Sequence, residues 1–142
     1  METTTTKPIV TIETTVQAPV AKVWNYWNEP AHITQWNSPS PDWHTPRATN
    51  DLRVGGQLNA RMEAKDGSFG FDFGATYDEV RPNEYIEYTI GDGRKVKIHF
   101  TTSGNSTNIV ESFEAESEHP VDFQRAGWQA ILDNFKKYTE SH

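Results

Sequence analysis

Cysteine is absent from the sequence, basic residues form no cluster, and the uninterrupted apolar runs are only a few residues long. Without cysteine there is no disulfide, no thiol nucleophile and no thiolate metal site. The net charge of −7 argues against nucleic acid and anionic membranes, which both attract clustered Lys and Arg. No segment has the length and apolar character of a signal peptide or a membrane span. We therefore expect a soluble, cytoplasmic protein with no nucleic-acid or membrane partner.

Aromatic residues, in contrast, are plentiful: five Trp, five Tyr and seven Phe in 142 residues. This length suits one domain, and the aromatic bulk exceeds what a core of this size needs. The Thr-rich start of the chain is polar, and chain ends are loose unless an element holds them. We expect a flexible tail over residues 1–8 and a single domain over residues 9–142.

The first third of the chain predicts one strand and two short helices. The β-branched run at residues 9–16, "IVTIETTV", is typical of a strand. Pro19 suits the first turn of a helix, and Pro30 ends it. "AHITQWN" at residues 31–37 predicts a second short helix, and the Pro-rich residues 38–46 predict an irregular loop.

The middle of the chain predicts an antiparallel meander. Apolar and polar residues alternate in segments such as "YIEYTI" (residues 85–90) and "KVKIHFTT" (residues 95–102). Asp-Gly pairs in "KDGS" and "GDGR" are typical hairpin turns between such segments. The period-2 patterns and the turn signals agree on the same boundaries, which indicates about six or seven strands in all.

The C-terminal segment changes to a helical period. Pro120 suits a helix start, and an apolar stripe follows at helical spacing. The stripe consists of Phe123, Gly127, Ile131, Phe135 and Tyr138, widened by Trp128 and Leu132. Strands that are segregated from helices in this way indicate an α+β fold with the long helix on one face of the sheet.

Five segments in this order resemble the START-like superfamily, also called SRPBCC, which has the helix-grip fold of the birch pollen allergen. Within it the chain is similar to bacterial homologues of the activator of heat-shock protein 90 ATPase. The segments are "APVAKVWNYWNEPAHITQW", "DLRVGGQLNARMEAKDGS", "FDFGATYDEVRPNEYIEYT", "IVESFEAES" and "GWQAILDNFKKYTES". Together they span roughly residues 10–141, which is nearly the whole chain.

The resemblance implies a curved antiparallel sheet wrapped around the long C-terminal helix, with a pocket between them. Members of the superfamily bind lipids, sterols, polyketides and other apolar molecules, and some are cyclases or hydrolases. The eukaryotic co-chaperone has an additional N-terminal domain that contacts the chaperone, and 142 residues leave no room for it. On this basis we expect ligand contacts from Trp43, Met62, Phe71, Phe73, Tyr77, Tyr88, Phe100, Glu111, Phe123 and Trp128.

Two features carry the expectation of a lined pocket. In "FGFDFGATYDEV" (residues 69–80), rings recur on one face of a strand, and they serve either as core or as pocket wall. Glu111 lies between Ile109 and Phe113, so alternation points its carboxylate inward. A buried acid requires a partner, so Glu111 is either a ligand anchor or general acid, a structural partner of Arg61 or a helix residue, or turned outward by a β-bulge.

Other candidate residues give weaker signals. Trp36, Trp43 and His44 lie near the loop that would cover a pocket, where they either contact a ligand or form a hydrophobic plug. For Trp36 we favour the plug. Gly127 in the long helix indicates close approach of sheet or ligand. No two histidines have metal-ligand spacing and none is expected in a cluster with acids, so we predict no metal. We predict no cofactor either, since no phosphate-cradling glycine loop or nucleophile motif is present.

Three functions remain, and the sequence ranks them. The first is a binding protein for an apolar or amphipathic small molecule, without catalytic residues. The resemblance implies a stress-related role for such a protein. The second is a chaperone or stress-response partner of the heat-shock ATPase activator type, which would need an exposed apolar patch. The third is a cyclase- or hydrolase-like enzyme that uses Glu111 with Tyr77, Tyr88 or Arg61. A homodimer through a sheet edge suits such folds, although no residue specifies it.

Overall fold

The computed structural model describes residues 8–142, and the predicted tail therefore lies, but for Pro8, outside the described residues. The elements are β1 (Ile9–Val16), α1 (Val20–Asn28), α2 (Pro30–Trp36), β2 (Trp43–Asn50), β3 (Gln57–Ala64), β4 (Gly70–Arg81), β5 (Tyr85–Ile90), β6 (Lys95–Ser103), β7 (Ser106–Glu114) and α3 (Val121–Ser141). Both short helices and the long C-terminal helix are where the sequence predicts them.

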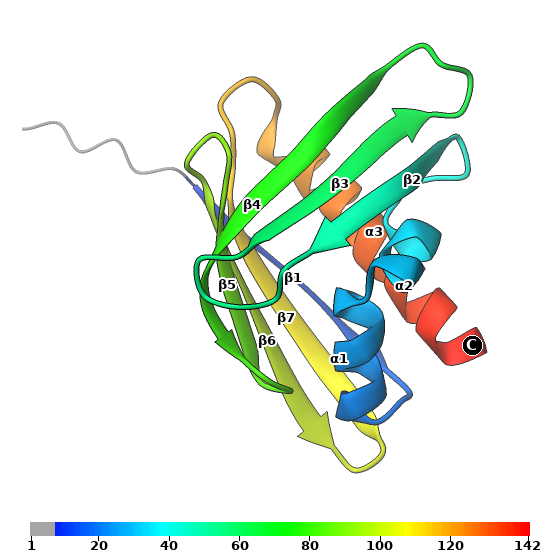
Figure 1. Ribbon diagram of the computed structural model, residues 1–142, viewed down its shortest axis with the longest axis vertical. Coiled ribbons are helices and arrows are strands. Elements are labelled where there is room, and N and C mark those ends of the chain that lie inside the picture. The colour runs from blue at the N-terminus through cyan, green and yellow to red at the C-terminus, as the bar shows by residue number, and fades with distance from the viewer. Residues whose placement is uncertain (1–7) are drawn as a thin grey trace, which may run out of the picture.

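The strands form one antiparallel sheet in the order β1-β7-β6-β5-β4-β3-β2. β2 to β7 follow one another as a meander, and β1 joins the far edge beside β7. The turns that the sequence predicts are present, with Gly67 and Gly93 in the left-handed region that glycine adopts freely (φ 79° and 94°). The sheet curls, α3 crosses its concave side, and α1 and α2 cover the remaining part (Figure 1). The α+β helix-grip prediction is confirmed.

The predicted loop over residues 38–46 is wrong in its second half, because β2 begins at Trp43. Pro46 misled the prediction, since proline cannot donate a ladder hydrogen bond. β2 is the last strand at one edge of the sheet, where proline is tolerated. The pairing of β2 with β3 also shifts between His44 and Arg47, as expected of a bulge that accommodates this residue.

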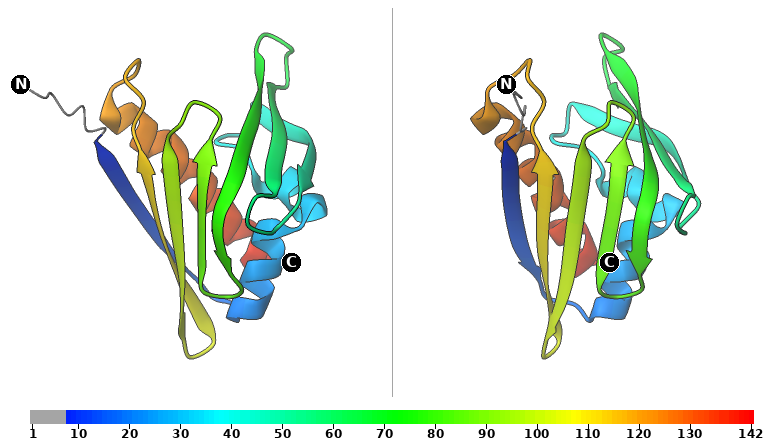
Figure 2. Two further views of the ribbon diagram at one scale, coloured as in Figure 1. Left: turned by 60° about the vertical axis from the view of Figure 1, so that its left-hand side comes forward. Right: turned by 90° about the vertical axis from the view of Figure 1, so that its left-hand side faces the viewer.

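β4 is much longer than its neighbour β5, and this difference opens one end of the fold. β4 pairs with β5 only from Ala75 onward, whereas it pairs with β3 as far as Gly70. The hairpin of β3 and β4 therefore projects beyond the rest of the sheet (Figures 1 and 2). The rings of residues 69–80 follow this projection: Tyr77 is 3% exposed, Phe71 39% and Phe69 61%. One face of the strand thus runs from core to solvent.

The apolar stripe predicted for α3 is out of phase at its beginning. Gln124, Leu132, Phe135 and Thr139 are buried, while Phe123 is exposed. Gly127 has no heavy atom within 4 Å of the position that a Cβ would occupy, so the predicted close approach there is wrong. The second half of the stripe, from Trp128 onward, faces the sheet as predicted and packs with its core.

None of the helices in the described part of the chain combines the length and apolar character needed to cross a membrane.

Candidate ligand-binding cavity

A cavity of about 250 Å³ lies between the sheet and the three helices. Its wall takes residues from β3, β4, β5 and β7 on one side and from α1, α2 and α3 on the other. Seven aromatic side chains contribute to it: Trp27, Trp36, Phe71, Phe73, Tyr77, Tyr88 and Trp128. Strand alternation places Phe71, Phe73, Tyr77 and Tyr88 on the inner face, because every second side chain points toward the helices. The three tryptophans come from the helices on the other side.

Seven of the ten predicted ligand contacts line this cavity: Met62, Phe71, Phe73, Tyr77, Tyr88, Glu111 and Trp128. They come from four strands and from α3, and the fold brings them together across almost 70 residues of sequence.

The other three predicted contacts lie elsewhere. Phe123 is 65% exposed and stacks on His119, because α3 is rotated relative to the predicted stripe. Phe100 is buried under α1, edge-on to Trp24 at 5.3 Å. Trp43 is the first residue of the edge strand β2 and does not line the cavity. Its ring centroid lies 5.9 Å from that of Phe69 and 6.2 Å from that of Phe71.

Several wall residues were not predicted as contacts. Trp27 of α1 and Trp36 of α2 line the cavity together, and their ring centroids are 5.1 Å apart. Trp36 is anchored by the hydrogen bond that its indole nitrogen donates to the Tyr26 carbonyl at 2.9 Å. Trp36 is therefore a buried, anchored ring, as a hydrophobic plug would be, and it also forms part of the cavity wall. Ile131 of α3 also lines it, and only its membership of the helical stripe could have indicated this.

Glu111 is the buried acid of the cavity. It lies on β7 between two core residues and is 6% exposed, so the inward orientation predicted from alternation is confirmed. Arg61 is not its partner, since Arg61 binds Glu63 at 2.9 Å and Asp72 at 3.5 Å. No bulge turns Glu111 outward either: it pairs in regular register with Ile12 and Ile98. Burial raises the pKa of its carboxyl group from 4.5 to about 8.

The two tyrosines of the wall differ in their hydroxyl groups. Tyr77 donates its hydroxyl to Asn50 Oδ1 at 2.7 Å, and Asn50 in turn donates its amide to the carbonyl of Asn28. Tyr88 makes no such bond within residues 8–142, and its ring lies edge-on to Phe73 and Tyr77. Burial and the nearby Glu111 raise the pKa of Tyr88 well above its usual value, so the phenol stays neutral.

The open end of the cavity lies at the β3–β4 hairpin. Phe71 is the most exposed residue of the wall and belongs to a cluster of three rings with Phe69 and Trp43. We call these three residues the aromatic rim. Arg94, in the turn between β5 and β6, also lines the cavity. Its guanidinium is held by Asp92 at 2.8 Å and by the carbonyl of Glu114 at 3.4 Å.

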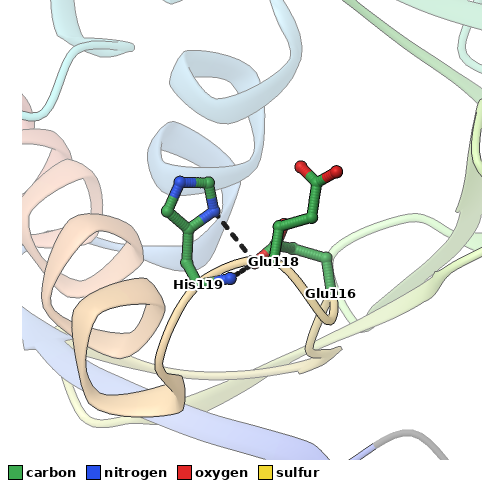
Figure 3. Close-up of side chains that lie close together, drawn as sticks. All are labelled: Glu116, Glu118 and His119. Atoms are coloured by element: carbon green, nitrogen blue, oxygen red, sulfur yellow. Dashed lines mark hydrogen bonds and ion pairs between the residues drawn. The ribbon is translucent and has the colours of Figure 1, made fainter.

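One acid–histidine cluster lies outside the cavity, just before α3. Contrary to the sequence prediction, His119 lies with Glu116 and Glu118, and their ligand-type atoms are all within 4.8 Å of one another (Figure 3). Glu116 Oε1 accepts a hydrogen bond from the backbone N–H of His119 at 2.7 Å and lies 3.1 Å from its ring nitrogen. Glu118 and His119 are exposed. These bonds stabilise the turn that precedes α3.

Comparison with known proteins places this geometry in a family. The family described as "Activator of Hsp90 ATPase homolog 1-like protein" matches residues 17–140. No protein in the curated set matches the chain.

Among solved structures, an AHSA1-like protein from Aeromonas hydrophila is 42% identical, with a TM-score of 0.89 over 94% of this chain and 93% of that one. A protein from Cytophaga hutchinsonii is 59% identical, with a TM-score of 0.81 over 93% of this chain and 92% of that one. CalU16 from Micromonospora echinospora shares the fold at 18% identity, with a TM-score of 0.68 over 92% of this chain and 75% of that one.

Proposed function

The chain belongs to the family of Activator of Hsp90 ATPase homolog 1-like proteins, and we propose that within this family it is a small-molecule binding protein. It holds one apolar or amphipathic ligand in the cavity between the sheet and α3. The observation that carries this proposal is the aromatic wall around about 250 Å³ of space, with a single buried acid in it. A mostly apolar pocket with few polar groups is the usual form of a small-molecule site.

The dimensions of the cavity support a ligand more than an empty packing defect. Well-packed cores contain few voids larger than a water molecule, and an apolar cavity of roughly 150 Å³ already binds benzene. A space of about 250 Å³ is larger than that. It also has a route to solvent at the aromatic rim, where Phe71 is 39% exposed.

Native mass spectrometry of the protein purified from its own host tests this proposal. We expect a population whose mass exceeds the chain by one small molecule, which organic extraction releases. Ala60→Leu is the matched control, because Ala60 is a buried wall residue and the larger side chain fills the cavity without adding a charge. The bound mass should disappear in this variant while its circular dichroism spectrum stays the same. A protein that is empty in every preparation and unchanged by Ala60→Leu contradicts the proposal.

A second candidate is a partner of a heat-shock ATPase, and the aromatic rim is the observation that favours it. Phe69 is 61% exposed and clusters with Trp43 and Phe71, which gives the exposed apolar patch that such a role requires. Because Phe71 also lines the cavity, we assign the rim first to ligand entrance. A Phe69→Ser variant that loses stimulation of an Hsp90-type ATPase but keeps its ligand would reverse this order.

An enzyme that uses Glu111 ranks third. General acid–base chemistry usually pairs the acid with a second group in hydrogen-bond reach. Over residues 8–142 no side chain forms a hydrogen bond or ion pair with Glu111. Tyr77, which could assist it, already donates its hydroxyl to Asn50.

A further inference from the structure

The ligand class follows from the polar groups that the cavity leaves without protein partners. Glu111 is 6% exposed and faces the cavity, and no hydrogen bond or ion pair joins its carboxyl group to another described residue. Its strand neighbours in the register, Ile12 and Ile98, are apolar. A buried polar group is normally hydrogen-bonded, so this carboxyl group lacks a partner that a ligand can supply.

The surroundings of Glu111 keep its carboxyl group neutral. The charged or titratable groups that share the cavity wall are Tyr77 and Tyr88 from the sheet and Arg94 from the β5–β6 turn. The residues that α1, α2 and α3 contribute to the wall carry no charge. Arg94 is engaged with Asp92 and Glu114, and the pKa of Glu111 responds to burial alone. With a pKa of about 8, the group is about nine-tenths protonated at pH 7.

A protonated carboxyl group has an O–H donor, and Tyr88 provides a second one. Tyr88 is 6% exposed, lines the same cavity, and has no hydrogen-bond acceptor among the described residues. The charge of Glu111 acts on the pKa of Tyr88, so the two groups lie within electrostatic reach of each other. Tyr77 does not join this pair, because Asn50 accepts its hydrogen bond. The apolar cavity therefore contains two neutral O–H donors that have no acceptor among the described residues. The wall also contains one acceptor without a described donor, Asn28 Oδ1, which α1 contributes.

We infer that the ligand is a small carbonyl compound (a ketone, ester, lactone or amide on an apolar body) whose oxygen accepts hydrogen bonds from Glu111 and Tyr88. This inference rests on the proposed function, and it names the ligand class of the same site. A carbonyl oxygen has two lone pairs and can accept from both donors at once. The aromatic wall takes up the rest of the molecule.

Two other ligand classes fit the same groups less well. An amine would have to ionise Glu111 in a site that disfavours charge, where no described side chain forms a hydrogen bond or ion pair with its carboxylate. An anionic ligand would need Arg94, whose guanidinium already binds Asp92 and the carbonyl of Glu114. Both classes predict a different dependence of affinity on pH, so one titration series separates them from the carbonyl class.

The probes are four single-ring compounds of equal size. Scaled from the cavity that holds benzene, a space of this volume takes about ten non-hydrogen atoms. Acetophenone, cumene, 1-phenylethylamine and benzoate meet this limit and differ only in the group attached to the ring: carbonyl, apolar, cationic and anionic. Each is titrated into the ¹⁵N-labelled protein from pH 6 to pH 9.5 and followed by amide chemical shifts, with affinities from isothermal calorimetry.

We expect acetophenone to bind best, at least about fivefold more tightly than cumene at pH 6.5, as two neutral hydrogen bonds would give. Its affinity should be constant from pH 6 to pH 7 and fall about tenfold by pH 9, as Glu111 loses its proton. Glu111→Gln keeps a neutral donor, so this variant should retain the preference for acetophenone and lose the dependence on pH. Glu111→Leu and Tyr88→Phe should each reduce the ratio of acetophenone to cumene affinity about threefold or more.

Each remaining outcome decides between the two proposals. Equal binding of acetophenone and cumene at all pH values overturns the carbonyl inference and leaves the binding function standing. Preferred binding of 1-phenylethylamine that strengthens with pH overturns the inference in favour of a cationic ligand, and preferred binding of benzoate does so in favour of an anion at Arg94. If no probe shifts the amides of the cavity wall, and the protein from its host is also empty, the binding function itself fails.

Discussion

Trp128 of α3 stacks face to face on Phe113 of β7, with ring centroids 3.9 Å apart and an angle of 11° between the planes. The contact holds the helix on the sheet at the strand that also presents Glu111, two residues away on the same face. Trp128 lines the cavity, whereas Phe113 is 1% exposed and belongs to the core. The stack therefore forms the boundary between close-packed core and open cavity.

Trp128→Ala should destabilise the protein by about 3 kcal/mol, because it removes a large packed ring and enlarges a cavity that is already present. Urea unfolding followed by circular dichroism gives the change in free energy. Trp43→Ala is the control: Trp43 lies in the aromatic rim outside the wall, and its loss should change stability by less than about 1 kcal/mol. Equal effects of the two substitutions would contradict the assignment of the stack as the anchor of α3.

The buried Glu111 predicts that stability falls as pH rises between about 4.5 and about 8. In this window the folded state keeps the proton that the unfolded state has released, so deprotonation favours unfolding. Below the window both states are protonated, and above it both are ionised. The total loss is on the order of 5 kcal/mol by the usual conversion of a pKa shift.

The measurement for this prediction is the difference in unfolding free energy between the native protein and Glu111→Gln, from urea titrations at pH 5, 6, 7, 8 and 9. Glutamine has the same shape and no titratable proton, so all other groups cancel in the difference. The native protein should lose stability relative to the variant as pH rises, until the curve flattens above about pH 8. A difference that stays constant over this range would show that Glu111 is not buried as described.

Period-2 alternation explains why so much of the sheet could be predicted. Ile86, Tyr88 and Glu111 all face inward, as alternation indicates, because a strand with one buried face permits only one register. The hairpin turns at Gly67 and Gly93 fixed the strand ends in the same way, since few other residues adopt their backbone conformation. The face of each strand that points inward can thus be predicted from the local sequence.

The cavity itself was not predictable from local patterns. It depends on the relative lengths of two strands, because β4 extends beyond the end of β5. It also depends on the rotamers of rings such as Trp27 and Trp128. The family resemblance supplied the expectation of a pocket. Phe100 shows what a family resemblance leaves open: an inward-facing ring joins either the core or the wall, and periodicity does not distinguish them.

Gln124 shows why the helix phase was wrong at the start of α3. Its side chain accepts a hydrogen bond from the Glu116 amide at 2.9 Å and donates to the carbonyls of Glu116 and His119 at 3.0 and 2.8 Å. These bonds satisfy backbone groups of the turn before the helix. Hydrophobicity alone favours Phe123 for the buried position, yet only an amide side chain can meet these three polar groups.

Gln124→Ala should therefore cost about 2–3 kcal/mol, because it leaves backbone groups of the turn unpaired. Phe123→Ala, one position away, should cost less than about 1 kcal/mol, since this ring is 65% exposed. Urea unfolding measures both, and hydrogen exchange at the Glu116 amide should accelerate only in Gln124→Ala. The reverse order of the two effects would restore the phase that the apolar stripe predicts.

Gly127→Ala should stabilise the protein by about 0.5–1 kcal/mol. Within a helix glycine is less favourable than alanine by about this amount, because its backbone loses more freedom on folding. In this position an added Cβ would meet no heavy atom within 4 Å, so no clash offsets the gain. The measurement is the midpoint of urea unfolding with an unchanged slope. Gly56→Ala is the opposing control, since its Cβ would collide with the backbone oxygen of Asp51, and we expect a loss of more than about 1 kcal/mol there. A destabilised Gly127→Ala variant would mean that sheet, ligand or partner approaches the helix at this residue after all.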